Sequence, residues 1–140
     1  MSSIVPSAEQ FQQFLADYPD GEPVVMLNLL RFREQADYPA DFDAEPCSGA
    51  EAYGRYGTAV VERVASVGGR LVWTGAAHPT VIGPTDEAWD LVALIEYPSK
   101  QAFADMLAQP EYQAVAPHRT ASLADSRLVP MRAAPDAFSG

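Results

Sequence analysis

Polar side chains interrupt two otherwise apolar segments, and their types suit proton transfer and the binding of an oxyanion. Asn28 lies within the apolar residues 24–30 and is soon followed by Arg31, while Glu96 ends the apolar residues 91–95. A buried carboxyl group resists ionisation and can transfer a proton, and a buried amide needs hydrogen-bond partners. We therefore predict a catalytic Glu96, with Asn28 and Arg31 binding the substrate. The alternative is that Glu96 and Arg31 lie at strand ends and pair with surface charges.

A second pair of polar residues, His118 and Arg119, follows Pro117. Histidine transfers protons near neutral pH, and the planar guanidinium of arginine suits a carboxylate. We predict His118 as the alternative catalytic acid or base and Arg119 as a substrate-binding residue. The alternative is a helix-surface pair that contacts acidic neighbours.

Aromatic residues are placed where they would form either core or pocket. Tyr53 and Tyr56 lie one helical turn apart, and Trp73 and Trp89 lie in predicted strands. Aromatic side chains at such spacings usually pack in the core, but their hydroxyl and indole groups need partners when buried. We predict that Tyr53 and Trp73 form walls of a substrate pocket.

The sequence predicts neither a metal site nor a bound cofactor. It contains two histidines and one cysteine, Cys47, without the spacing of a zinc site. Glycine-rich nucleotide motifs and the G-x-S-x-G motif of hydrolases are absent.

Composition and charge limit the class of protein. The 140 residues, 48% hydrophobic and 20% charged, predict a single domain over residues 1–140 with its core in 23–132. A net charge of -10 disfavours nucleic acid as a partner, and the apolar segments are too short to span a membrane. The lone Cys47, with no signal-peptide pattern in residues 1–6, predicts a cytoplasmic location.

Periodicity and turn signals predict alternating helices and strands. Capping boxes at Ser7 and Ser48 begin helices over 7–18 and 49–67, Ser99 begins a third, and a fourth covers about 111–123. Strands are predicted over 24–32, 70–74 with a resumption at 80–82, 89–97 and 127–132. Residues 33–47 are predicted to form an acidic surface loop, and residues 133–140 a flexible tail.

Without the first helix, this order is the split βαβ pattern of an α+β, ferredoxin-like fold with a four-stranded antiparallel sheet. Residues 24–30 and 91–95 would form its middle strands, and they are apolar on both faces. Two helices cover one face, so we predict that a second copy covers the other, giving a homodimer. The alternative is that the helix over 7–18 covers that face.

Several motifs also carry a family resemblance. They are Gly68-Gly69-Arg70, Ile95-Glu96-Tyr97-Pro98-Ser99, Phe103, Pro110-Glu111-Tyr112-Gln113 and Arg119. Over about residues 48–132 the chain resembles a bacterial domain-of-unknown-function family of dimeric α/β-barrel proteins. The resemblance implies a homodimer whose two sheets enclose a cavity. Related barrel families include cofactor-independent monooxygenases, isomerases and cyclases, and haem-handling proteins. The helix over 7–18 and the loop 33–47 depart from the family pattern.

Two functions are consistent with these features. The first is a cofactor-independent enzyme that acts on a small carbonyl-bearing or aromatic metabolite, with Glu96 or His118 moving the proton. The second is a small-molecule-binding or sensory dimer without catalysis.

Overall fold

The computed structural model describes residues 2–138, which contain one antiparallel sheet with strand order β2-β3-β1-β4. The strands are β1 (Val24–Phe32), β2 (Arg70–Ala76), β3 (Leu91–Tyr97) and β4 (Leu123–Met131), and the helices are α1 (Ala8–Asp17), α2 (Gly49–Ser66), α3 (Lys100–Ala108) and α4 (Pro110–Ser122). The two most apolar strands, β1 and β3, are the middle ones, as predicted. The predicted α+β, ferredoxin-like class with an additional N-terminal helix is confirmed.

Local sequence signals explain where the helices begin. The hydroxyl groups of Ser7, Ser48 and Ser99 accept hydrogen bonds from backbone N–H groups in the first turns of α1, α2 and α3. At the end of α2, Gly68 adopts a φ of 82°, a left-handed conformation that favours glycine.

The largest differences from the predicted strand boundaries are in β2 and β4, while β3 begins two residues later than predicted. β2 continues unbroken to Ala76 and does not resume at residues 80–82, because β3, its only hydrogen-bonded neighbour among the described strands, begins at Leu91. β4 begins at Leu123 rather than residue 127, since α4 passes directly into the strand and the Leu123 side chain is fully buried.

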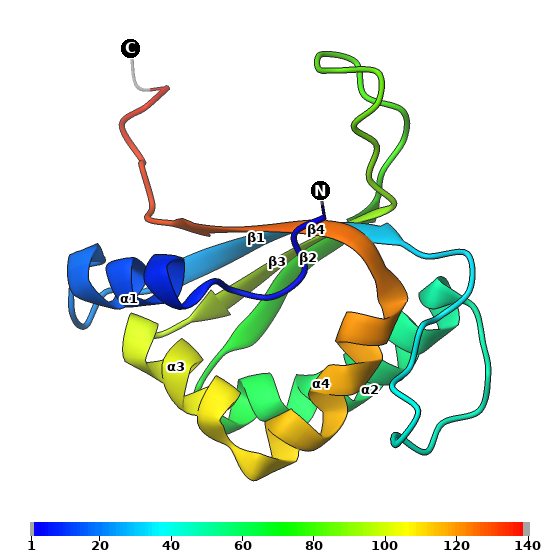
Figure 1. Cartoon of the computed structure of the whole chain (residues 1–140). Helices are drawn as coiled ribbons and strands as arrows, with labels where there is room; N and C mark the ends of the chain where they lie inside the picture. Colours follow the sequence, from blue (N-terminus) through cyan, green and yellow to red (C-terminus); the bar gives the residue numbers. More distant parts are fainter. Residues whose placement is uncertain (1, 139–140) are drawn as a thin grey trace.

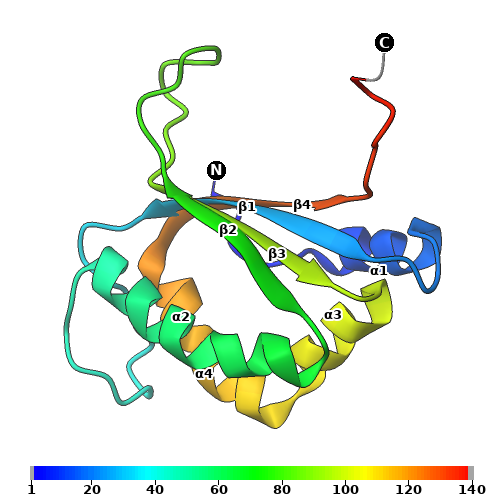
Figure 2. The same cartoon turned by 180° about the vertical axis from the view of Figure 1, so that it is seen from behind.

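The helices cover one face of the sheet (Figures 1 and 2). Along β1, Val24, Met26, Asn28 and Leu30 are buried on this face, and the alternating residues point to the other side. The main core packs Val24 and Met26 against side chains of α2, α3 and α4, including Tyr56, Phe103 and Tyr112.

Helix α1 lies beside β4 on the helix-covered side of the sheet (Figure 1). The rings of Phe11 and Phe14 contact Phe103 of α3 at centroid distances of 6.3 and 6.2 Å. The buried Lys100 ammonium donates hydrogen bonds to the carbonyl oxygens of Leu15 and Tyr18 at the end of α1. The alternative in which the first helix covers the opposite face is therefore wrong for this chain.

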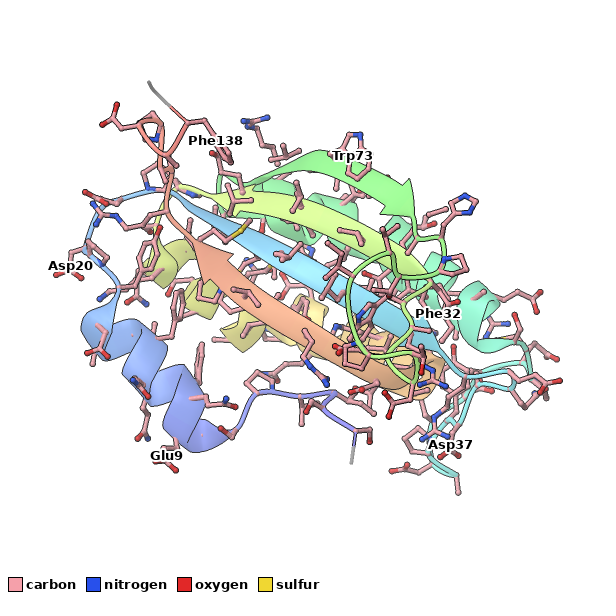
Figure 3. The ribbon with its side chains drawn as sticks, turned by 90° about the horizontal axis from the view of Figure 1, so that it is seen from above. Glu9, Asp20, Phe32, Asp37, Trp73 and Phe138 are labelled. Carbon is pink, nitrogen blue, oxygen red and sulfur yellow. The ribbon has the colours of Figure 1, made fainter. Side chains whose placement is uncertain are left out.

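No helix within residues 2–138 covers the second face of the sheet, which we call the outer face (Figure 3). Its apolar residues are Val25, Leu27, Leu29, Trp73, Val92, Leu94 and Val129. Trp73 is 59% exposed.

The loop 77–90 and the tail after β4 rise from opposite ends of the sheet on this side (Figure 1). The loop carries Val81 and Ile82, which are 97% and 93% exposed.

Candidate ligand-binding cavity

A cavity of about 580 Å³ lies between the helix-covered face of the sheet and helices α1, α3 and α4. Its walls combine apolar side chains, including Phe11, Ile95 and Met106, with a group of hydroxyl, amide and guanidinium side chains. Residues 3–6, which we call the N-terminal strap, close one side. Cavities of this size and mixed lining are typical of small-molecule sites.

Four tyrosines from three elements form much of the polar wall: Tyr53 and Tyr56 of α2, Tyr97 of β3 and Tyr112 of α4. The hydroxyl oxygens of Tyr56 and Tyr112 lie 3.0 Å apart and share a hydrogen bond. Burial raises the pKa of Tyr53, Tyr56 and Tyr97 above the ordinary value. These hydroxyl groups are consequently neutral at physiological pH and able to donate hydrogen bonds.

Asn28 reaches the cavity from the middle of β1. Its amide nitrogen donates to the carbonyl oxygens of Met26 and Ala93, both at 3.3 Å. These two bonds use both amide hydrogens. The arrangement leaves the amide oxygen to accept a hydrogen bond from a ligand.

Arg119 lies in the last turn of α4, joins the cavity wall and holds the N-terminal strap. Its guanidinium donates a 2.6 Å hydrogen bond to the carbonyl oxygen of Ile4. Two more bonds fix the strap: Ser126 Oγ donates to the Ser3 carbonyl oxygen, and the Ser3 N–H donates to Asp125. The strap is therefore attached entirely through residues at the junction of α4 and β4.

The structure brings together three of the seven predicted site residues, Asn28, Tyr53 and Arg119, in this cavity. It does not bring Glu96, Arg31, Trp73 or His118 to the cavity wall. The predicted catalytic and binding roles of these four stay predictions.

Glu96, Arg31 and Trp73 point to the opposite side of the sheet from the cavity. Glu96 lies between Ile95 and Tyr97, which both line the cavity, so the alternation of a strand directs its side chain to the outer face. There Glu96 accepts a 2.9 Å hydrogen bond from Arg70 Nε. This placement matches the alternative of a strand-end ion pair. Arg31 lies at the exposed end of β1, near Asp125 and the base of the loop 77–90.

His118 lies on α4 beneath the loop 33–47. Its Nδ1 is 2.7 Å from the Tyr38 hydroxyl oxygen, and its ring also contacts Phe42 edge-on. Arg55 Nη1 donates to the same hydroxyl oxygen, at 3.3 Å, and to the Glu45 carbonyl oxygen. Burial, followed by the charge of Arg55, lowers the pKa of His118. His118 thus ties the acidic loop to the helices.

Sequence reasoning did not assign Tyr97, Tyr112, Ser126 or the N-terminal strap to the site. Tyr97 and Tyr112 belong to the motifs that carried the family resemblance, so their spacing was a usable signal. The strap had none, because it reaches the cavity through long-range contacts with Arg119, Asp125 and Ser126.

Two further observations concern the described residues as a whole. They contain no group of three or more His, Cys, Asp or Glu side chains positioned to hold a metal ion. None of their helices is both long and apolar enough to cross a membrane.

Comparison with known proteins identifies a family and a close structural relative. The model of a family described as a domain of unknown function (DUF1330) matches residues 47–132. A protein of unknown function from Rhodopseudomonas palustris is 40% identical, with a TM-score of 0.87 over 96% of this chain and 98% of its own. No curated protein matches.

More distant structures share the fold alone. An uncharacterised NIPSNAP domain protein from Burkholderia xenovorans is 16% identical, with a TM-score of 0.52 over 84% of this chain and 98% of its own. A dimeric protein of unknown function with a ferredoxin-like fold, from Bacteroides fragilis, is 13% identical, with a TM-score of 0.51 over 82% of this chain and its entire length.

Proposed function

This chain belongs to the DUF1330 family of domains of unknown function. From the cavity of the chain itself, we propose that it binds a small, largely apolar molecule that bears a carbonyl group or an aromatic ring. The observation that carries this proposal is the composition of the cavity wall. Apolar rings and aliphatic groups surround a limited set of polar groups, namely the tyrosine hydroxyls, Asn28 and Arg119. Such a wall buries an apolar ligand body and fixes its orientation through a few hydrogen bonds.

Catalysis without a cofactor is the second candidate function. It is favoured by the concentration of hydrogen-bond donors, because neutral tyrosine hydroxyls and Arg119 would stabilise negative charge that develops on a carbonyl oxygen. The described cavity wall contains no Asp, Glu or His. An enzyme working in this cavity would therefore use a tyrosine as its proton donor, because Glu96 and His118 lie outside the cavity wall.

The outer face supports a homodimer as the functional unit. It is a broad apolar surface left uncovered in the single chain, and such surfaces mark association sites. A second copy packed on it would also meet the loop 77–90, whose exposed Val81 and Ile82 project on the same side. The Bacteroides fragilis protein of the same fold is dimeric, which supports association of this chain. Cys47, present as a free thiol, supports a reducing, cytoplasmic location for the dimer.

A cavity-blocking variant tests the binding proposal. Ala116 lines the cavity from α4, so Ala116→Phe places a ring inside it. In a thermal-shift screen of carbonyl-bearing and aromatic metabolites, hits that stabilise the wild type should no longer stabilise Ala116→Phe. The matched control is Ala104→Phe on α3, outside the cavity lining. Hits that stabilise all three proteins equally would place binding elsewhere.

Mass spectrometry of each hit after prolonged incubation separates the two candidate functions. A product formed by the wild type and absent with Ala116→Phe would support catalysis in the cavity. Recovery of every hit unchanged would support binding alone.

A further inference from the structure

The cavity wall has an unbalanced charge. Its described residues include four tyrosines, Arg119 and Arg127 but no aspartate or glutamate. Arg127 pairs with Leu29 in the strand register, so its side chain leaves β4 on the outer face and Arg119 is the arginine whose side chain joins the wall. The chain as a whole carries a net charge of -10. A wall with an arginine side chain and no carboxylate thus differs from the acidic composition of the chain as a whole.

Arg127 is already neutralised by a neighbour. Its Nη1 lies 2.8 Å from Asp125 Oδ1, and its guanidinium packs 5.2 Å from the centroid of the Trp89 ring. Burial alone would raise the pKa of Asp125, but hydrogen bonds from the Ser3 N–H and from Arg127 outweigh this effect. The pKa of Asp125 is lowered overall, so the carboxylate is ionised.

Arg119 lacks such a counter-ion among the described residues. Its guanidinium donates to the neutral carbonyl oxygen of Ile4 and takes part in none of the salt bridges of the described residues. A half-buried cation is normally paired with an anion. Tyr53, Tyr56 and Tyr97 do not supply that anion, because burial raises the pKa of each hydroxyl group and keeps it protonated.

The remaining donors of Arg119 match a carboxylate. A guanidinium has five N–H donors, and the bond to the strap uses one of them. Two parallel N–H groups bind a carboxylate in a bidentate manner, which gives the charge-assisted bonds their strength and direction. Neutral tyrosine hydroxyls on the same wall add donors, and the apolar remainder suits a ring system.

We propose that the ligand of this cavity is a monocarboxylate with an aromatic or alicyclic body, and that its carboxylate pairs with Arg119. This inference rests on the proposed binding function of the cavity. The ligand carries one negative charge because the wall provides one uncompensated cation. A phosphate or dicarboxylate would leave a second charge without a partner, at a large desolvation penalty.

Matched pairs of probes test this proposal. Benzoate, 2-naphthoate and biphenyl-4-carboxylate are each compared with the corresponding amide by isothermal titration calorimetry at one ionic strength. At least one carboxylate should bind the wild type about tenfold or more tightly than its amide, as expected for hydrogen bonds to a charged group. Arg119→Gln should remove this preference, because it weakens binding of the carboxylate more than binding of the amide.

Two variants control for folding and for charge in general. Arg119→Lys keeps the charge and should retain part of the preference even if Arg119→Gln folds poorly. Arg132→Gln removes a more exposed arginine, paired with Glu22 away from the cavity, and should bind all probes as the wild type does.

The possible failures are distinguishable. Amides that bind as tightly as carboxylates, or a preference that survives in Arg119→Gln, would overturn the monocarboxylate proposal and leave the binding function standing. If no probe of either series binds the wild type, the monocarboxylate proposal fails. If the thermal-shift screen also yields no hit that Ala116→Phe abolishes, the proposed function fails with it.

Discussion

The hydroxyl pair of Tyr56 and Tyr112 illustrates how single residues set the chemistry of the cavity. Both side chains are buried, and each hydroxyl is the hydrogen-bond partner of the other at 3.0 Å. The pair joins α2 to α4 across the core and holds polar groups at the cavity wall without a charged residue. A buried hydroxyl that loses its partner carries the full penalty of desolvation.

We expect Tyr112→Phe to lower the free energy of unfolding by about 1–3 kcal/mol, because it leaves the Tyr56 hydroxyl unpaired. Adding Tyr56→Phe should recover most of this loss, since both partners are then apolar. Urea unfolding of the wild type, the two single variants and the double variant gives the coupling energy. Simple additivity of the two single effects would show that the hydroxyls do not stabilise each other.

The contact of His118 with Tyr38 predicts a dependence of stability on pH. Arg55 donates to the Tyr38 oxygen, so the Tyr38 O–H donates to Nδ1 of a neutral His118. The pKa of His118 is lowered from its ordinary 6.5 in the folded chain. As the pH falls through that value, the unfolded chain takes up the proton first, and the free energy of unfolding decreases.

Urea unfolding at pH values from about 7.5 to about 5 measures this loss. His118→Gln should flatten that part of the profile, whereas His78→Gln, which removes an exposed histidine from the loop 77–90, controls for the loss of an imidazole. A His118→Gln profile with the slope of the wild type would exclude His118 as its origin.

At the residue scale, the sequence predicted which side chains interrupt the apolar strands but not which face they occupy. Asn28 and Glu96 were grouped because both stand in middle strands. The pairing of Asn28 with Ala93 puts Asn28 and Glu96 on opposite faces, since Ala93 and Glu96 are three residues apart. Register between strands depends on long-range contacts, which a single sequence does not display.

At the element scale, α1 shows how an added helix extends the site. It lies beside β4, outside the βαββαβ core, and brings the N-terminal strap over the cavity. Its attachment uses Lys100, the only lysine of the chain, which contacts the carbonyl oxygens of Leu15 and Tyr18 and the carboxylate of Asp20. From α3, the long Lys100 side chain donates hydrogen bonds to carbonyl groups that have no partner within α1.

Lys100→Met should therefore loosen α1. We expect a loss of about 1–3 kcal/mol in the free energy of unfolding, because the carbonyl groups at the end of α1 lose their donor. Hydrogen exchange should rise in α1 and in the strap more than in β1. Gln101→Met, at an exposed position of the same helical turn, is the matched control. Unchanged exchange in α1 would contradict this account of its docking.

The boundaries of elements followed local signals where these exist and tertiary contacts elsewhere. Serine caps predicted the starts of α1, α2 and α3 to within a residue. The apparent strand at 80–82 failed because Val81 and Ile82 project from the sheet on a loop, where no neighbouring strand pairs with them. Beta-branched residues favour a strand only where a partner strand is present.

At the scale of the whole molecule, the sheet has one occupied face and one open face. The family resemblance implied a cavity between two sheets, which stays a prediction. The helices and the cavity described above use the first face, so this cavity lies within a single chain. The N-terminal strap and α1 account for this, because they extend the helical layer past β4 and complete the wall. The outer face is then available for association without competition from the ligand.

Leu27→Glu tests association through the outer face. Leu27 lies at the centre of that face, paired with Leu94 on one side and Val129 on the other. A twofold interface would bring two such glutamates close together in an apolar environment, at a large penalty for their charges.

Sedimentation velocity should show a homodimer for the wild type and a folded monomer for Leu27→Glu. Trp73, exposed in the single chain, should emit at longer wavelength in that monomer. Thr58→Glu, on the exposed side of α2, should remain dimeric. A wild-type protein that sediments as a monomer at micromolar concentration would overturn the dimer, while the cavity and its proposed ligand would stand.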